Sequence, residues 1–211
     1  MKSASTNHVQ IAIKMAIISD KYQAIFIHIY KTGGTSIRSM IDDKQMIHAA
    51  HATALDAKKA MMGDARWNDY WKFTIVRNPY DLVESLFYHH RRDNPRTFPT
   101  MEDQLQWIKR RWGKTISHTD GPPYISQHEW LTENGQMLVD NVFKFDDLQD
   151  VHRSLFELRG YNAPFPLPKL NDSLVRPKQP IGTCFTPNQI ALINQLYAAD
   201  FAHFKYSKIT E

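Results

Sequence analysis

The sequence contains one cysteine and no long apolar run, and both absences narrow the class of protein. Because Cys184 is the only cysteine among 211 residues, the chain cannot form an internal disulfide, which is typical of a reducing compartment; we expect a cytoplasmic protein. No apolar stretch approaches the ~20 residues that a membrane-spanning helix needs. The early segment IAIKMAII contains Lys14 and lacks a small-residue cleavage site, so we expect neither a membrane span nor a cleaved signal peptide.

Several motifs of metal and nucleotide chemistry are also missing. Neither CxxC nor HExxH occurs, so no metal site is predicted. The absence of a GxxxxGK[ST] loop disfavours an ordinary ATP or GTP site. There is no internal repeat, and a composition of 42% hydrophobic and 23% charged residues excludes a wholly disordered chain. The length suits a single domain spanning residues 1–211.

The charge balance is mildly basic and does not by itself identify a partner. The formal net charge is +4, and the sequence pI is about 9.1. A modest excess of this size suits an anionic small molecule, a nucleic acid or simply a solvated basic face. Many of the basic residues occur in two short groups: Arg91, Arg92 and Arg96, and then Lys109, Arg110, Arg111 and Lys114.

Apolar runs alternate with helical patterns, which predicts an α/β protein of three layers, with a central parallel sheet flanked by helices. A buried strand is expected at residues 24–29, followed by a tight glycine turn and a helix from about Thr35. A second strand is expected around residues 46–48, and a helix over residues 53–62. A third strand, at residues 72–76, runs into Asn78 and Pro79, which fit a helix cap and a first helical position.

The second half of the chain predicts one more strand and two helices. The strand is expected at residues 138–145, and the helix after it ends at Gly160. The last helix begins with Thr186 as N-cap, Pro187 in its first position and Gln189 at the capping-box position. Between these helices, the proline-punctuated residues 161–187 predict a long loop or lid.

Two strand-to-helix junctions have the chemistry of anion sites. In FIHIYKTGGTSIRSMI a buried strand leads through a glycine loop to a helix N-terminus, where main-chain N–H groups favour negative charge. A simple βα turn with an exposed lysine is the alternative. In KFTIVRNPYDLVESLFY, Arg77 ends a strand and Ser85 lies two turns into the next helix, so both can contact a second phosphate. Two such sites at the carboxyl ends of adjacent parallel strands suggest a doubly phosphorylated nucleotide.

Together, HIYKTGGTS and FTIVRNPYDLVESLFY resemble the two cofactor motifs of the PAPS-dependent sulfotransferases, in particular their carbohydrate sulfotransferase-like branch. The resemblance extends through HATA at residues 51–54, and more weakly through QHEWLTENGQMLVDNVFKFDDL and YAADFAHFKY. One departure is Tyr30, where such proteins commonly have proline. The resemblance implies a P-loop NTPase-like sulfotransferase fold and the cofactor 3′-phosphoadenosine-5′-phosphosulfate. It assigns the 5′-phosphosulfate to Lys31, Thr32, Gly33, Gly34, Thr35 and Ser36, and the 3′-phosphate to Arg77 and Ser85.

Transfer to a hydroxyl needs a base near the attacking oxygen, and histidine suits that role near neutral pH. His51 is the first candidate because the resemblance places the base in this region; His48 is the second, and Glu129 remains an alternative. Lys31 is expected to stabilise charge on the bridging oxygen. His28 is expected to be a core histidine. His89 and His90 are expected at an exposed helix end.

The acceptor is predicted to be a hydroxyl, most simply on a carbohydrate or glycolipid. Four aromatic residues could stack on a saccharide or could belong to the core: Trp107, Trp112, Tyr124 and Trp130. Asn171 and Ser173 could close over the nucleotide or could be turn residues. Two other functions remain open: an atypical nucleotide-dependent kinase, and a non-catalytic polyanion-binding module. No nucleic-acid-binding motif occurs, so a nucleic acid is not an expected partner.

Overall fold

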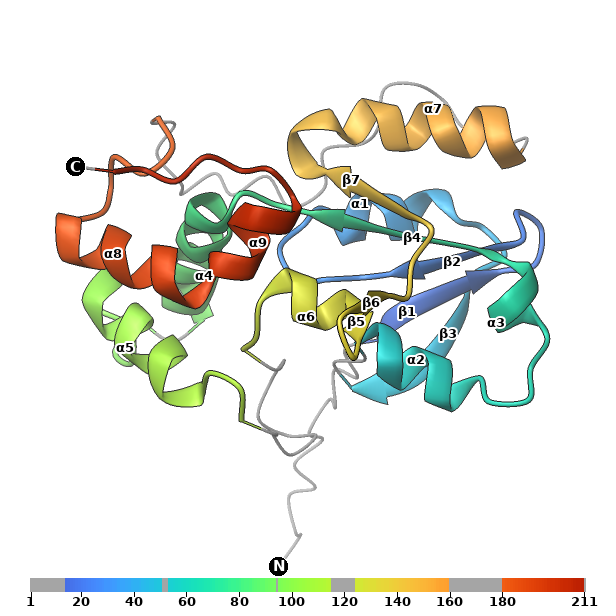
Figure 1. Ribbon diagram of the computed structural model, residues 1–211, viewed down its shortest axis with the longest axis horizontal. Coiled ribbons are helices and arrows are strands. Elements are labelled where there is room, and N and C mark those ends of the chain that lie inside the picture. Colours follow the sequence, from blue (N-terminus) through green and yellow to red (C-terminus); the bar gives the residue numbers. More distant parts are fainter. Residues whose placement is uncertain (1–13, 51–52, 94, 115–123, 160–179, 211) are drawn as a thin grey trace, which may run out of the picture.

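A five-stranded sheet with the strand order β3-β1-β2-β4-β7 lies at the centre of the protein (Figure 1). The computed structural model describes residues 14–50, 53–93, 95–114, 124–159 and 180–210. The five strands are β1 (Lys14–Ser19), β2 (Ala24–Ile27), β3 (Gln45–Ala50), β4 (Trp71–Val76) and β7 (Asn141–Lys144).

The predicted central parallel sheet is mostly parallel, but it contains one antiparallel strand, β1, that was not predicted. β2, β4 and β7 are parallel, but β1 runs antiparallel to both of its neighbours, β2 and β3. Only residues 20–23 separate β1 from β2, and a connection this short permits only antiparallel pairing. β1 is an inner strand of the sheet, and its residues Ala16, Ile17 and Ile18 are buried in the apolar clusters on the two faces.

Helices cover both faces of the sheet, as the three-layer prediction requires. α1 (Gly34–Met40) and α7 (Leu148–Arg159) pack on one face, where Ile37 and Val151 meet the apolar side chains of Phe26 and Phe73. The opposite face, which includes Ile25, contributes to a second apolar cluster that continues into the other helices, some of which lie beyond the end of the sheet (Figure 1). Those helices are α2 (Ala54–Ala60), α4 (Pro79–Asp93), α5 (Met101–Arg111), α6 (Gln127–Leu131), α8 (Pro187–Leu196) and α9 (Ala198–His203). The short helices are α3 (Arg66–Asp69) and the 3-10 turn η1 (Phe145–Asp147).

The predicted helix starts are confirmed at atomic detail. Thr53 caps α2 and Thr186 caps α8, each through a reciprocal capping box. The side chain of Asn78 accepts a hydrogen bond from the N–H of Tyr80 (3.1 Å) at the start of α4. Side-chain caps are local, which explains why the sequence predicts them well. The predicted end at Gly160 and most of the predicted loop at residues 161–187 lie outside the described residues.

The strand predicted at residues 138–145 is shorter than expected: β7 spans Asn141–Lys144, and Phe145 begins the 3-10 turn. A small hairpin precedes β7. β5 (Thr132–Glu133) and β6 (Gln136–Met137) pair through Asn134 and Gly135, both with positive φ. An Asn-Gly pair is the common sequence signal for such a two-residue turn. Helix α5 was also not predicted, although its Thr100–Asp103 capping box is visible in the sequence.

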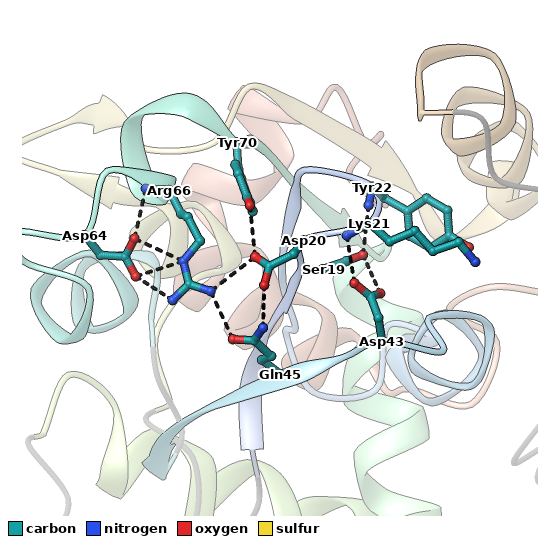
Figure 2. Close-up of polar contacts among 9 residues, drawn as sticks. All are labelled: Ser19, Asp20, Lys21, Tyr22, Asp43, Gln45, Asp64, Arg66 and Tyr70. Atoms are coloured by element: carbon teal, nitrogen blue, oxygen red, sulfur yellow. Dashed lines mark hydrogen bonds and ion pairs between the residues drawn. The ribbon is translucent and has the colours of Figure 1, made fainter.

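A polar network holds the edge of the sheet at which β2 and β4 begin (Figure 2). Arg66 donates to the Asp64 carboxylate (2.6 Å) and pairs with Asp20 (3.2 Å), which also accepts from the Tyr70 hydroxyl (2.9 Å). The Tyr70 hydrogen bond, followed by the one from Arg66, lowers the pKa of Asp20. These groups are half-buried or exposed. They join the β1–β2 turn to α3 and lie at the edge opposite the predicted anion site. Within the described ranges, every helix is too short or too polar to span a lipid bilayer.

Candidate anion-binding site at the carboxyl edge of the sheet

The two predicted phosphate sites lie side by side, because β2 and β4 are adjacent and parallel. Ile27 of β2 pairs with Thr74 of β4, so the chains leave the sheet at the same edge and reach Lys31 and Arg77 a few residues later. The Arg77 guanidinium donates through Nη1 to the main-chain carbonyl of Lys31 (3.1 Å). In Figure 1, α4 and α9 lie beyond this edge of the sheet.

The loop after β2 requires both of its glycines, each for a different reason. Gly33 has φ +82°, a left-handed conformation that residues with a Cβ rarely adopt. A Cβ at Gly34 would lie 1.9 Å from Cδ2 of His28, so no side chain fits there without displacing that ring. Thr32 is fully buried, and its hydroxyl donates to the carbonyl of Ile29 (2.8 Å). Lys31 itself has φ +61°.

The predicted loop residues differ in exposure. Thr32, Gly34 and Ser36 are buried, Lys31 and Gly33 are half-buried, and Thr35 is exposed. The hydroxyl of Thr32 therefore supports the loop from within. Lys31 and Thr35 are the loop side chains that solvent and a ligand can reach.

Arg77 is buried at 8% exposure and is held on several sides. Its guanidinium carbon lies 4.2 Å from the centroid of the Phe145 ring, and its Nε lies 3.8 Å from Oδ2 of Asp81. The Phe145 ring also approaches the glycine loop, since its Cε2 would be 3.0 Å from a Cβ at Gly33. Phe145 is thus placed between both predicted phosphate sites, and the sequence offered no signal for that role.

Ser85 lies on α4 in a half-buried position, one helical turn after Asp81. Residues four apart share a helix face, so Ser85 is on the face that begins beside the Arg77 guanidinium. His89 follows one turn later on the same face. The 77-81-85-89 spacing is visible in the sequence.

Positive charge is concentrated around Lys31. Partial burial, followed by the charges of Arg77 and Arg92, lowers the pKa of Lys31. Burial, followed by the charge of Lys31, lowers the pKa of His89 to about 4. The same two causes lower the pKa of His90, whose Nδ1 lies 3.0 Å from Oε1 of Gln104. The expectation of an exposed His89–His90 end was wrong: both are half-buried because the end of α4 lies near the loop and α5.

The three candidate bases differ in where they lie in the structure. His51 lies outside the described residues. His48 is in β3, which runs in the same direction as β2 because both are antiparallel to β1, so β3 ends at the same sheet edge as Lys31. Glu129 is exposed, and its Oε2 accepts from the N–H (3.0 Å) and hydroxyl (2.8 Å) of Ser126 in the capping box of α6. Asn171 and Ser173 also lie outside the described residues.

His28 directly follows β2 and is half-buried against the inside of the loop, so the expectation of a core histidine holds only in part. Its ring stacks on Phe26 with centroids 5.6 Å apart and fills the space next to Gly34. Burial, followed by the charge of Arg38, lowers its pKa to about 4. The imidazole is therefore neutral at physiological pH and acts as a packing group.

The four aromatic residues considered for stacking on an acceptor are divided by burial. Tyr124 and Trp130 are each 1% exposed and belong to the core, so they offer no face to an acceptor. Trp107 and Trp112 are half-buried and make edge contacts, Trp107 with Tyr124 (4.7 Å between centroids) and Trp112 with Tyr197 (4.9 Å). Arg111 lies over the Trp107 ring at 4.8 Å.

The geometry defines an α/β protein with a candidate anion-binding centre, built from a glycine loop and a buried arginine. Such a centre can hold a ligand with two phosphate groups and can stabilise negative charge that develops beside Lys31. In the described part of the chain, no group of three or more His, Cys, Asp or Glu side chains is arranged to hold a metal ion.

The sequence model of the Sulfotransferase family matches residues 14–207, nearly the whole chain. The protein therefore belongs to the sulfotransferase family, whose members transfer sulfate groups. The match includes both strand-to-helix junctions and the helices that surround them. No curated protein and no solved structure matches the chain.

Proposed function

We propose that this protein transfers the sulfuryl group of 3′-phosphoadenosine-5′-phosphosulfate to a hydroxyl of a carbohydrate or glycolipid. The observation that carries the proposal is the Arg77–Lys31 hydrogen bond at the carboxyl edge of two adjacent parallel strands. It supports two anion anchors at a fixed separation, which is what a nucleotide with phosphates at both its 3′ and 5′ positions requires.

The residues present fit such a cofactor chemically. Lys31, Arg77 and Arg92 bring three positive charges together. Arg77 lies near Asp81, and Arg92 pairs with Asp93. In this proposal the loop from Lys31 to Ser36 holds the 5′ end, and Arg77 with Ser85 holds the 3′-phosphate. When bound, the cofactor supplies the sulfuryl group for transfer.

The chain's own contribution is mainly positioning and charge stabilisation. Lys31 lies on a loop whose shape is determined by Gly33, Gly34 and the buried Thr32. This loop fixes the main chain from which the Lys31 ammonium extends. Charged or polar groups stabilise a transition state most effectively when they already point towards the atom on which charge develops. A histidine base, His51 first and His48 second, would take the proton of the acceptor hydroxyl.

Exposed basic side chains support an acceptor that carries negative charge. Arg91, Arg92 and Arg96 follow one another along the end of α4 and the segment after it, and all three are exposed. Arg92 contributes to the field at Lys31, so the basic surface reaches the proposed transfer site. A sulfated or carboxylated saccharide fits this arrangement better than a neutral one.

A thermal-shift titration with 3′-phosphoadenosine-5′-phosphate, beside ADP and ATP at equal concentration, tests the cofactor. A ligand at 100 times its dissociation constant adds about 2.7 kcal/mol to the free energy of unfolding. Selective stabilisation by the bisphosphate supports the proposal, and a turnover assay with sugar acceptors follows. Stabilisation by ATP alone would indicate a kinase. No shift with any nucleotide, together with steeply salt-dependent polyanion binding, would indicate a binding module.

A further inference from the structure

The main chain of Arg77 is held by a single buried side chain, that of Gln127. Oε1 of Gln127 accepts from the Arg77 N–H (2.8 Å), and Nε2 donates to the Arg77 carbonyl (2.8 Å). Gln127 is 1% exposed and is the first residue of α6, fifty residues away in sequence. The residue directly after β4 is thereby fixed although it is no longer part of the sheet.

Asp200 of α9 in turn holds Gln127. Its Oδ2 accepts from Nε2 (3.0 Å) and from the main-chain N–H (3.0 Å) of Gln127, and its Oδ1 accepts from the N–H of His128 (2.9 Å). Asp200 is fully buried. The side-chain NH₂ of Gln127 donates to both Asp200 and the Arg77 carbonyl. The Asp200 carboxylate therefore fixes the side-chain amide of Gln127 with its NH₂ towards the Arg77 carbonyl and its oxygen towards the Arg77 N–H.

We propose that Gln127 and Asp200 are positioning residues that orient Arg77 towards the 3′-phosphate of the nucleotide, and so set the preference for a 3′-phosphorylated ligand. This inference rests on the proposed function and adds to it the residues that select the ligand. The physical reason is that a bidentate guanidinium contact tolerates little rotation of its own main chain. The long Arg77 side chain multiplies a small rotation at its Cα into a large displacement of its guanidinium.

The side-chain contacts of Arg77 do not determine the orientation of its main chain. Phe145 lies over the guanidinium, and Asp81 lies to one side of it, so these residues limit where its tip can move. The Gln127 amide instead limits the peptide units on either side of the Arg77 Cα. A residue that acts only on the fold would affect all nucleotides equally, whereas Gln127 is expected to affect nucleotides with a 3′-phosphate much more than those without one.

The test compares adenosine 3′,5′-bisphosphate with adenosine 5′-monophosphate by calorimetric titration on wild type, Gln127→Leu and Asp200→Asn. Leucine has nearly the same volume as glutamine but makes none of the hydrogen bonds. We expect Gln127→Leu to weaken the bisphosphate at least tenfold and the monophosphate less than threefold. Asp200→Asn should change the same ratio in the same direction by a smaller factor, because asparagine retains one acceptor oxygen.

Gln189→Leu is the matched control. Gln189 is a buried glutamine in the capping box of α8 and contacts Glu102 rather than Arg77. It should lower thermal stability and leave the ratio of the two affinities unchanged. If Gln127→Leu and Asp200→Asn leave the ratio of the two nucleotide affinities unchanged, the positioning role is overturned. A wild type without preference for the bisphosphate would overturn the proposed function itself, and the positioning role with it.

Discussion

The carbonyl of Lys31 accepts a hydrogen bond from the guanidinium of Arg77, so the two predicted phosphate sites are mechanically joined. One arginine both supports the lysine loop and is available to a second anion. The loop and the start of α4 therefore form one centre, and a change at Arg77 is expected to affect both ends of a bound nucleotide.

Lys31→Met is expected to remove binding of the 5′ phosphate end without destabilising the fold. The pKa of Lys31 is lowered by burial and by Arg77 and Arg92, so its charge is unfavourable in the absence of ligand. Methionine keeps the length of the side chain and removes that charge. Thermal melts without nucleotide should be unchanged or shifted upwards, while turnover falls by at least a hundredfold. A large loss of stability would show that Lys31 supports the loop structurally.

Unlike Lys31→Met, Arg77→Lys is expected to lower the stability of the fold as well as nucleotide binding. A lysine cannot make a fork-shaped contact with a phosphate, and it fits poorly over the Phe145 ring. We expect a loss of about 1–3 kcal/mol in the free energy of unfolding, as for other broken contacts of buried charged groups. Denaturant unfolding measures this loss, and retention of full stability would contradict the structural role of the guanidinium.

Gly34→Ala is expected to destabilise the protein strongly, because the new methyl would lie 1.9 Å from the His28 ring. Overpacking of this kind costs about 1–3 kcal/mol, and more where the neighbour cannot move. The double variant Gly34→Ala with His28→Ala should be more stable than the sum of the two single effects predicts. Additive losses in chemical denaturation would show that the clash is relieved in some other way.

Nucleotide binding is expected to change the protonation of His89. Its pKa of about 4 lies below the ordinary value of 6.5, so the folded state binds fewer protons than the unfolded state between these values, and this group makes the free energy of unfolding rise with pH there. A bound phosphate offsets the charge of Lys31 and raises the pKa of His89. Calorimetry in buffers of different ionisation enthalpy, near pH 5.5, should show more proton uptake by wild type than by His89→Asn. Equal uptake would contradict this coupling.

Glu129→Gln is expected to preserve both stability and turnover, whereas His51→Ala should reduce turnover strongly. Glutamine can fill the same capping-box position, where Glu129 accepts from Ser126. Parallel measurements of kcat and thermal stability on both variants, with His48→Ala as a third, distinguish the three candidate bases. A silent His51→Ala and an inactive Glu129→Gln would reverse the assignment.

Local patterns predicted the elements of this protein that depend on neighbours in sequence. The helix caps at Thr53, Asn78 and Thr186, and the strand at residues 72–76, depend on interactions within a few residues. The glycine loop is equally local: Gly33 needs a left-handed backbone. The need for a second glycine at residue 34 comes from His28, six residues earlier, which no turn rule would identify.

The sequence by itself determined the family, the glycine loop and the cationic residues at the ends of two strands. Tertiary structure decided which of these residues meet. β1 is antiparallel to β2 because the connection between them is short. That rule can be applied only after β1 is recognised as a strand. The hydrogen bonds of Gln127 with Arg77 and with Asp200 join segments that are 50 and 73 residues apart. Phe145, which lies against Gly33 and Arg77, comes from a further segment of the chain. Such contacts depend on how whole elements pack, so no local pattern in the chain encodes them.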